Sequence, residues 1–561
     1  MLTSQTISSG LLNFKQVKQS SLQYITLMKS IFLVFFLILL SAKVRAQSLD
    51  STNLPLVIID TYGMDIPDGT KIPAGIKIIF HADGSYNHPA DPGNVYNGNA
   101  GIEIRGRYSA TLPQKPYGFE TRDATGNNLN VSLFGMPAEN DWILIANYND
   151  KSFVRNALAF RMFRDNGNYA PRTVLCEVIV NGAYQGIYVL CEKIKPDKGR
   201  VNIKKLGTAD NTGDIVTGGY IFSVDYYEYN NYWKGSFSPP GYSGKDVYFV
   251  YNFPKPDEIT AEQKSYLQNY VNDFESVLYG NNFKDPVTGY RAYINVASFI
   301  NYFIVNEVSR NVDGYKKSCF YNKDRNSMNG LLNAGPVWDF DWAWKNINEC
   351  YFGATNGSAW AYKVLECNVW PTPTGWMPRL MEDPAFIDEL KIKYSALRKT
   401  ILSDSYLMHY IDSVNSQIAD AQVRHFKKWP ILGQNVGAPE VGYIPTTYDA
   451  ETTKFKNWIT TRLQWLDTQL LVPDSYGVDE NPAGLACRLY PNPAHDILAI
   501  ETNIPVESLN IYSYTGTLIQ SMDGKQSNLL QVTVSSLKSG IYIVKMELEG
   551  GMIISRKLII D

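Results

Sequence analysis

The run from residue 306 reads Asn306-Glu307-Val308-Ser309-Arg310-Asn311-Val312-Asp313-Gly314-Tyr315-Lys316-Lys317-Ser318-Cys319-Phe320-Tyr321, and Trp338-Asp339-Phe340-Asp341-Trp342 follows it. Cys319 to Lys323 has the composition of a strand, Asp324 to Gly330 that of a turn, and Leu331 to Trp338 that of a returning strand. These segments predict a β-hairpin. Because its turn lies midway between Asp313 and Asp339, antiparallel pairing places both carboxylates at the same open end, on neighbouring strands about 5 Å apart.

Three acids, Asp313, Asp339 and Asp341, therefore gather in one place, and the only basic residues nearby that we count as partners are Arg310, Lys316 and Lys345. Crowded carboxylates repel one another unless a cation neutralises them, and a hard divalent cation with oxygen ligands suits them. The alternative for any single Asp is that it caps backbone amides at a turn. The three acids together favour a metal-dependent site.

The pattern N-E-x-x-x-N-x-D-G-Y-K-K-S-x-F-Y, followed by G-P-V-W-D-F-D-W-A-W, resembles the spore-coat protein H (CotH) kinase-like family. That family has a distant protein-kinase-like fold and transfers the γ-phosphate of ATP to protein Ser. The resemblance implies that Asp313 is the catalytic acid, that Asp339 and Asp341 bind metal, and that the cofactors are ATP with Mg²⁺ or Mn²⁺. One position departs from kinases: Ser318, a weaker metal ligand, stands where they carry Asn.

Other blocks resemble the nucleotide-binding elements of the same family. Arg105 and Lys115 lie in segments like its R-G-x-x-S and P-K-K-x-Y blocks, although a Lys at a strand start is usually solvated. Glu192 ends the predicted hairpin Val174 to Lys193 and is expected to meet the nucleotide-contacting Lys or the metal, since a buried acid is rarely unpaired. Arg155 is a candidate phosphate or carboxylate clamp, and Lys255 lies in a segment like the family's Y-P-K element.

The length and composition of the chain limit the number of domains. The chain has 561 residues, of which 45% are hydrophobic and 13% aromatic, enough for two or three domains. We predict an α+β fold: an atypical protein-kinase-like catalytic domain over residues 47–471, β-rich first and helical later, then a linker over 472–486 and a small all-β, sandwich-like domain over 487–561. Helices are expected over Leu380 to Tyr410, Ser413 to Trp429 and Thr452 to Leu471. The interval from Tyr226 to Ser243 is predicted to be a surface loop in the substrate rim.

The segment 1–46 is predicted to be a secretory signal peptide with an upstream extension, cleaved before Gln47. It holds five basic residues and no acid, and its apolar run is short for a membrane span. Without it, 47 Lys and Arg face 55 Asp and Glu, a net charge of −8. Nucleic acid is therefore not an expected partner, and no transmembrane anchor is expected after cleavage. Export permits disulfides: Cys176 with Cys191 across a hairpin, and Cys350 with Cys367.

The end of the chain resembles the C-terminal sorting domain of type IX (Por) secretion. It begins with Leu489-Tyr490-Pro491-Asn492-Pro493, contains Gly540-Ile541-Tyr542-Ile543-Val544-Lys545, and ends in a Lys-containing strand. The resemblance implies passage through the type IX machinery to a secreted or cell-surface location.

The leading hypothesis is an exported protein kinase that phosphorylates Ser of a secreted or surface protein whose identity the sequence does not give. A second hypothesis is a cell-surface binding or structural protein that keeps the kinase-like scaffold with weak or no catalysis, which Ser318 and the scarcity of ATP outside the cell favour. A third uses Asp313 and Asp339 as the acid pair of a glycosidase.

Overall fold

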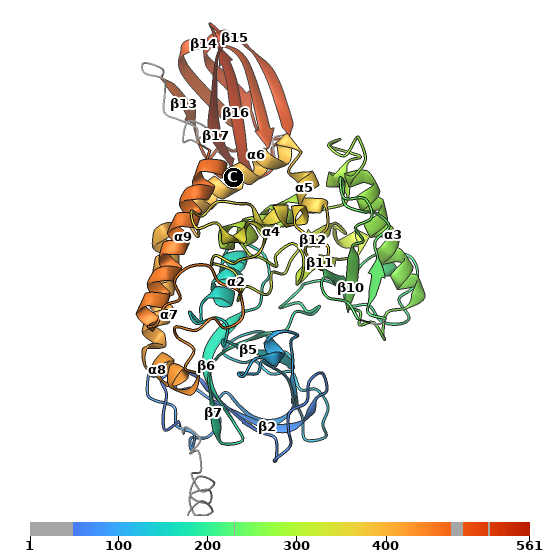
Figure 1. Cartoon of the computed structure of the whole chain (residues 1–561). Helices are drawn as coiled ribbons and strands as arrows, with labels where there is room; N and C mark the ends of the chain where they lie inside the picture. Colours follow the sequence, from blue (N-terminus) through green and yellow to red (C-terminus); the bar gives the residue numbers. More distant parts are fainter. Residues whose placement is uncertain (1–48, 229, 473–485, 514–516) are drawn as a thin grey trace, which may run out of the picture. The chain divides into compact units, whose positions relative to one another are not determined.

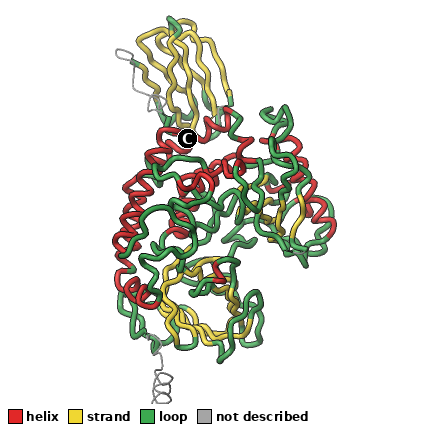
Figure 2. The backbone as a smooth tube through the Cα atoms, in the orientation of Figure 1, coloured by secondary structure: helices red, strands yellow, loops and turns green. Residues whose placement is uncertain are grey.

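The computed structural model describes residues 49–228, 230–472, 486–513 and 517–561. The chain divides into two compact units, one formed by the chain up to Leu380 with Ile401–Leu463, the other by Met381–Thr400 with Gln464–Asp561. Helices and strands are both abundant, which confirms the α+β class (Figure 2). The predicted signal peptide and nearly all of the predicted linker lie outside the described residues.

Seven strands of the first unit form a closed barrel, the strand-rich ring that carries β2, β5, β6 and β7 in Figure 1. These strands are β1 (Leu56–Asp60), β2 (Ile72–Ile79), β3 (Tyr96–Ile104), β4 (Tyr117–Arg122), β5 (Asp141–Ala146), β6 (Thr173–Val180) and β7 (Ala183–Glu192). Parallel pairing of β1 with β6 closes the order β1-β2-β3-β4-β5-β7-β6. Alternate residues fill the interior, such as Ile76 and Ile78 on β2 and Trp142 and Leu144 on β5.

The β6–β7 hairpin confirms the predicted one. Its turn residues, Asn181 and Gly182, have φ angles of 48° and 77°, as tight two-residue hairpin turns require. Its register places Cys176 opposite Tyr188 and Cys191 opposite Thr173, so the prediction that the two cysteines face each other is wrong. Both are buried free thiols. The predicted Cys350–Cys367 disulfide is confirmed.

A second sheet in the first unit has the order β12-β11-β8-β10-β9. Its strands are β8 (Tyr220–Val224), β9 (Tyr232–Lys234), β10 (Tyr248–Phe253), β11 (Cys319–Lys323) and β12 (Leu332–Ala334). β11 and β12 pair antiparallel with Tyr321 opposite Ala334, which confirms the predicted hairpin. The returning strand is shorter than predicted, because Gly335 has a φ of 109° and Pro336 has no N–H to continue the ladder.

Three helices of the first unit lie before or between the strands of this sheet in the sequence. α4 (Val296–Ser309) is buried along most of its length and ends at Arg310, whose φ of 43° turns the backbone out of the helix. α2 (Arg155–Asp165) follows the barrel strand β5 in sequence. α3 (Ala261–Leu278) begins at a capping box, in which Thr260 and Gln263 bond each other's backbone.

The later helices differ from the predicted ones: the first two predicted helices are interrupted, and the last begins earlier than predicted, at Tyr448. The observed helices are α5 (Trp376–Leu380), α6 (Pro384–Arg398), α7 (Asp404–Gln417), α8 (Ala419–Lys428) and α9 (Tyr448–Leu470). The predicted continuous helix over Leu380 to Tyr410 is wrong, since the Ser403 hydroxyl accepts a hydrogen bond from the Tyr406 N–H and starts α7 anew. Ile418 likewise separates α7 from α8.

The second unit contains one antiparallel sheet, confirming a small all-β C-terminal part. Its strands are β13 (Cys487–Tyr490), β14 (Ile497–Ser513), β15 (Leu518–Thr533), β16 (Gly540–Leu548) and β17 (Met552–Ile560). The order is β13-β14-β16-β17, and β15 also pairs with β14. Leu498, Val506, Leu509 and Val544 are fully buried in its core. Over the described residues, none of the helices is both long and apolar enough to cross a membrane.

His425 on α8 makes the stability of the first unit sensitive to acid. Its ring is fully buried, and its Nδ1 accepts a hydrogen bond from the Ile187 N–H on β7 at 3.1 Å. Burial lowers the pKa of His425 to about 3. The folded state therefore keeps His425 neutral while the unfolded state takes up a proton below about pH 6.5.

We expect the free energy of unfolding to fall by about 1.4 kcal/mol per pH unit between about pH 6.5 and 3 on account of His425. In His425→Gln, which keeps an acceptor for the Ile187 N–H, this slope should be reduced. Urea unfolding at pH 7.0, 6.0 and 5.0 measures it, with the exposed His409→Gln as control. Equal slopes in His425→Gln and wild type would contradict the assignment.

Candidate active site

The β11–β12 hairpin brings the two predicted acids into one site. Asp313 lies between the end of α4 and the start of β11, and Asp339 follows β12. Asp313 is 3% exposed, and both burial and the charge of Asp339 raise its pKa. The two carboxylates therefore lie close enough to act on each other, as the hairpin predicts.

Two lysines hold the Asp313 carboxylate. Lys317 Nζ lies 3.1 Å from Oδ2 and Lys316 Nζ lies 3.6 Å from Oδ1. Oδ1 is buried and accepts no hydrogen bond from any described residue, and the Asp313 N–H donates to Asn311 Oδ1 at 3.1 Å. Asp313 is thus fixed in place while one of its oxygens keeps an unused acceptor position.

Asp339 occupies a strained backbone position with a φ of 69°. The Ser318 hydroxyl donates a hydrogen bond to its Oδ2 at 3.2 Å. Burial and the neighbouring Asp341 charge raise the pKa of Asp339 to about 7. Asp341 in turn accepts a hydrogen bond from the Asn149 side-chain amide. Asp339, Asp341 and Ser318 therefore form one group of oxygen donors, as predicted, and Asn149 is added to them.

Lys317 is a site residue that the sequence reasoning missed. Burial alone would lower its pKa, but Asp313 and Asp339 act on it in the opposite sense and raise the pKa of Lys317 above its usual value. Its ammonium also lies 5.5 Å from the centroid of the Trp342 ring. Lys317 is therefore a permanent positive charge between the two acids. Its place in the K-K pair directly before Ser318 could have singled it out.

Asp225 and Asn149 were also missed. β8 pairs with β11 so that Val224 lies opposite Cys319, which places Asp225 beside Ser318. Burial raises the pKa of Asp225 to about 6, and the Asp339 charge adds to the effect. Asn149 comes from the segment after β5. No local pattern identifies either residue, because strand pairing and chain packing bring them to the site.

Arg105 lies on the other side of Asp339. Its guanidinium is 5.5 Å from the Trp338 ring centroid, and its side chain makes no hydrogen bond or ion pair with the described residues. Burial lowers the pKa of Arg105, an effect that the nearby Asp339 charge opposes. Lys193, 3.5 Å from Asp141, is close enough to Arg105 that the two cations repel. Arg105 therefore carries a positive charge close to Asp339 without a carboxylate partner among the described residues.

The other predicted nucleotide contacts lie elsewhere. Lys115 Nζ donates to the Ala110 carbonyl at 2.8 Å. Lys255 is 62% exposed and pairs with Glu258 at 3.3 Å. Neither residue has a contact with the acids around Asp339 in the described structure.

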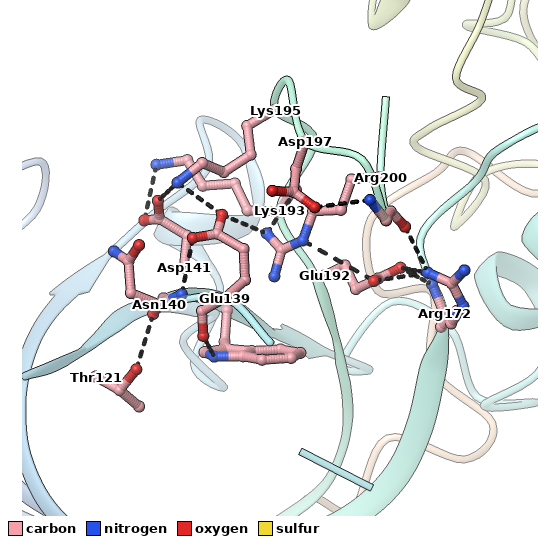
Figure 3. A network of polar contacts seen from close by, with 12 residues as sticks. Thr121, Glu139, Asn140, Asp141, Arg172, Glu192, Lys193, Lys195, Asp197 and Arg200 are labelled. Carbon is pink, nitrogen blue, oxygen red and sulfur yellow. Dashed lines mark hydrogen bonds and ion pairs between the residues drawn. The ribbon is translucent and has the colours of Figure 1, made fainter. Parts of the chain in front are cut away.

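Glu192 belongs to an ion-pair network at the end of β7 (Figure 3). Both its carboxylate oxygens accept from the Arg172 guanidinium, at 2.8 and 3.0 Å, and Arg200 Nε lies 3.9 Å away. Arg200 and Lys195 then connect it to Glu139, and Lys195 also lies 2.7 Å from Asp141. The prediction that a buried Glu192 must be paired is confirmed, and its partners are arginines of this network.

Arg155 is enclosed by protein acceptors. Its guanidinium pairs with Asp150 at 2.5 Å and with Glu451 at 3.1 Å, and its Nε donates to the Ala343 carbonyl at 3.2 Å. Burial by itself would lower the pKa of Arg155. The charges of Asp150 and, next in size, Glu451 act in the opposite sense, and the pKa of Arg155 is raised. It is a carboxylate clamp inside the protein, with its nitrogens already used.

Arg155→Met should lower the free energy of unfolding by about 3–5 kcal/mol, because it leaves two buried carboxylates without their partner. Nucleotide affinity of the folded variant should be unchanged, which calorimetry at low temperature can measure. Arg161→Met, which removes an exposed partner of Asp165, is the matched control on the same helix. Wild-type stability together with lost nucleotide binding would restore the phosphate-clamp interpretation.

The donor set at Asp339 suits a hard cation only with help from a ligand. Within the described residues, no three acidic, His or Cys side chains converge to hold a metal ion by themselves. The three predicted acids therefore do not form a complete metal cage. Mg²⁺ typically uses one or two carboxylates together with phosphate oxygens and water, and Asp339 and Asp341 with the Ser318 hydroxyl fit that smaller requirement.

Comparison with known proteins assigns two regions of the chain to families. The family model described as CotH kinase protein matches residues 102–466, more than half of the chain, and the model described as secretion system C-terminal sorting domain matches residues 488–561. No curated protein matches significantly. Among solved structures, CopC from Methylosinus trichosporium OB3b matches at 19% identity and a TM-score of 0.11, covering 14% of this chain and 94% of its own, too weak a likeness to argue from. The chain belongs to the CotH kinase protein family and ends in a secretion system C-terminal sorting domain.

Proposed function

We propose that this protein is an exported, kinase-like enzyme that transfers the γ-phosphate of ATP to Ser of a secreted or surface protein. Membership of the CotH kinase family and the sorting tail, which indicates secretion and cell-surface attachment through the type IX machinery, support the coarse assignment. The observation that supports the finer one is the ion pair of Lys317 with Asp313 at 3.1 Å, in a site where Asp339 also acts on the Lys317 charge.

In the proposed reaction, Asp313 accepts the proton of the Ser hydroxyl as the Ser oxygen bonds to the γ-phosphorus and ADP leaves. Asp313 suits this role as a carboxylate that Lys316 and Lys317 hold in place. Lys317, charged and 3.1 Å from Asp313, both fixes the base and offers positive charge to the transferred group.

Asp339 and Asp341 would hold a divalent cation, with the Ser318 hydroxyl and the Asn149 amide as neutral supports. When bound, Mg²⁺ or Mn²⁺ would neutralise phosphate charge. Arg105, which has no partner among the described side chains for its guanidinium other than the Trp338 ring, and Lys193 would contact the remaining phosphate oxygens. Arg155, Glu192, Lys115 and Lys255 have no part in this proposal, because each has its contacts elsewhere.

A second candidate, a binding protein with a kinase-like site, has two observations in its favour. Asp313 is paired with two lysines, and Ser318 is a poorer metal ligand than Asn. A scaffold that no longer catalyses transfer would tolerate both features.

Incubation of the mature chain with radiolabelled ATP and either Mg²⁺ or Mn²⁺ tests the proposal. Label should enter Ser residues of the protein itself or of an added acceptor such as casein, and EDTA should abolish it. If calorimetry shows ATP binding but no transfer occurs with either metal, the protein is a binding protein and not an enzyme.

The sorting tail gives a separate prediction. Deletion of residues 489–561 should retain the protein in the periplasm, because a signal peptide serves the inner membrane alone. Surface biotinylation and cell fractionation measure this, with a variant carrying an inserted tag after Asp561 as control. Truncated protein at the cell surface would show that the tail is not the export signal.

A further inference from the structure

A cluster of closely spaced aromatic rings lies next to Lys317, the partner of the proposed catalytic acid. We name it the aromatic platform, and it consists of Tyr226, Tyr227, Tyr232, Tyr248 and Trp370. Ring centroids are 4.7 Å apart for Tyr226 and Trp370, 4.2 Å for Tyr227 and Tyr248, and 4.5 Å for Tyr227 and Tyr232. Trp370 is 54% exposed and Tyr232 is 36% exposed. Large exposed aromatic surfaces of this kind mark interaction sites.

The platform is continuous with the active site through Lys317. The Lys317 ammonium lies 5.4 Å from the Tyr226 ring centroid and 3.1 Å from Asp313 Oδ2. Tyr226 also follows Asp225, which lies beside Ser318. The rings therefore adjoin the lysine that is paired with the acid assigned as base in the proposed reaction.

The exposed Trp370 is held in place by its neighbours along the chain. The Cys350–Cys367 disulfide closes the loop three residues before Trp370. Asn368 accepts a hydrogen bond from Lys245 Nζ at 3.2 Å, which ties the same loop to the segment before β10. An aromatic side chain that is both exposed and fixed loses little conformational entropy when it binds.

The chemistry around the rings favours an acidic peptide. The segment from Tyr226 to Ser243 is rich in Tyr, Ser, Gly and Asn, the composition of surfaces that bind proteins. Arg107 lies 4.7 Å above Tyr226 and is 53% exposed. Its ion pair with Glu228, itself 73% exposed, is 3.7 Å long and fully solvated, so a ligand carboxylate could replace it at little cost.

We propose that the aromatic platform binds an extended, acidic segment of the protein substrate and presents its Ser to Asp313. The inference rests on the proposed function for the role of that Ser as phosphate acceptor. Arg107 selects an acidic residue near the Ser, and Trp370 and Tyr227 supply the apolar contact. A neutral glycan could stack on Trp370 but would leave Arg107 without a new partner.

Binding without ATP separates this inference from the proposed catalysis. The probe is an immobilised library of short peptides with a central Ser and degenerate flanks, incubated with the full mature protein. Peptides with Asp or Glu beside the Ser should be enriched. Trp370→Ala and Tyr227→Ala should each weaken binding about tenfold or more, and Arg107→Ala should remove the preference for acid. Tyr62→Ala, an exposed Tyr of the barrel, is the matched control.

Three outcomes decide the matter. Peptide binding that is unchanged in Trp370→Ala and Tyr227→Ala overturns the inference. Retention on a neutral glycan array that depends on Trp370, with no peptide retained, assigns the platform to carbohydrate and also overturns it. Peptide binding with the expected mutant pattern, but without phosphate transfer after ATP and Mg²⁺ are added, supports the docking surface and contradicts the proposed enzyme.

Discussion

Asp339→Ala is expected to abolish metal-dependent nucleotide binding, raising the Kd for ATP in the presence of Mg²⁺ by about 100-fold or more, which is about 2.7 kcal/mol. The reason is that only two carboxylates serve the proposed cation, and removal of one leaves Asp341 with neutral oxygen donors. Isothermal calorimetry with and without Mg²⁺ measures the effect.

A second variant is needed because of the backbone conformation at Asp339. Its φ of 69° suits Asp or Asn better than Ala, so Asp339→Ala changes backbone strain as well as charge. Asp339→Asn keeps the conformation and removes the charge, and it should lose Mg²⁺-dependent affinity to a similar extent. Asp412→Asn, on the exposed face of α7, controls for net charge. Wild-type affinity in Asp339→Asn would rule out the metal role.

The local elements of the site could be predicted from sequence because their signals are local. Strand, turn and strand in the stretch after Asp313 fix a hairpin, and antiparallel pairing then brings Asp313 and Asp339 together whatever the rest of the chain does. The hairpin that turns at Asn181-Gly182 is confirmed for the same reason.

Partners from distant segments could not be predicted in this way. Asp225 reaches the site because β8 pairs with β11, and Asn149 reaches Asp341 across 192 residues of sequence. For Glu192 the sequence required a partner, since a buried acid must be paired, but it could not identify Arg172. Arg155 has the chemistry of a phosphate ligand in sequence, and only the structure shows Asp150 and Glu451 around it.

Asp313→Asn is expected to lower the rate of phosphoryl transfer by about 10²- to 10⁴-fold, because Asn keeps the shape of the side chain but cannot accept the Ser proton. ATP affinity should change little, since the proposed cation and phosphate contacts lie at Asp339, Asp341 and Arg105. Single-turnover transfer from labelled ATP and calorimetry, measured on the same preparation, separate the two quantities.

Loss of the base must be separated from loss of an ion pair. Asp313→Asn also removes the carboxylate facing Lys316 and Lys317, although Lys316 keeps Glu349 and Lys317 keeps the Asp339 charge. Glu349→Gln is therefore the matched control, because it takes the other carboxylate from Lys316 and leaves Asp313 untouched. It should preserve the transfer rate within a few-fold. An Asp that only supports the fold would lower the melting temperature instead of the rate. If wild type transfers phosphate and Asp313→Asn does so at a similar rate with an unchanged melting temperature, Asp313 is not the catalytic base.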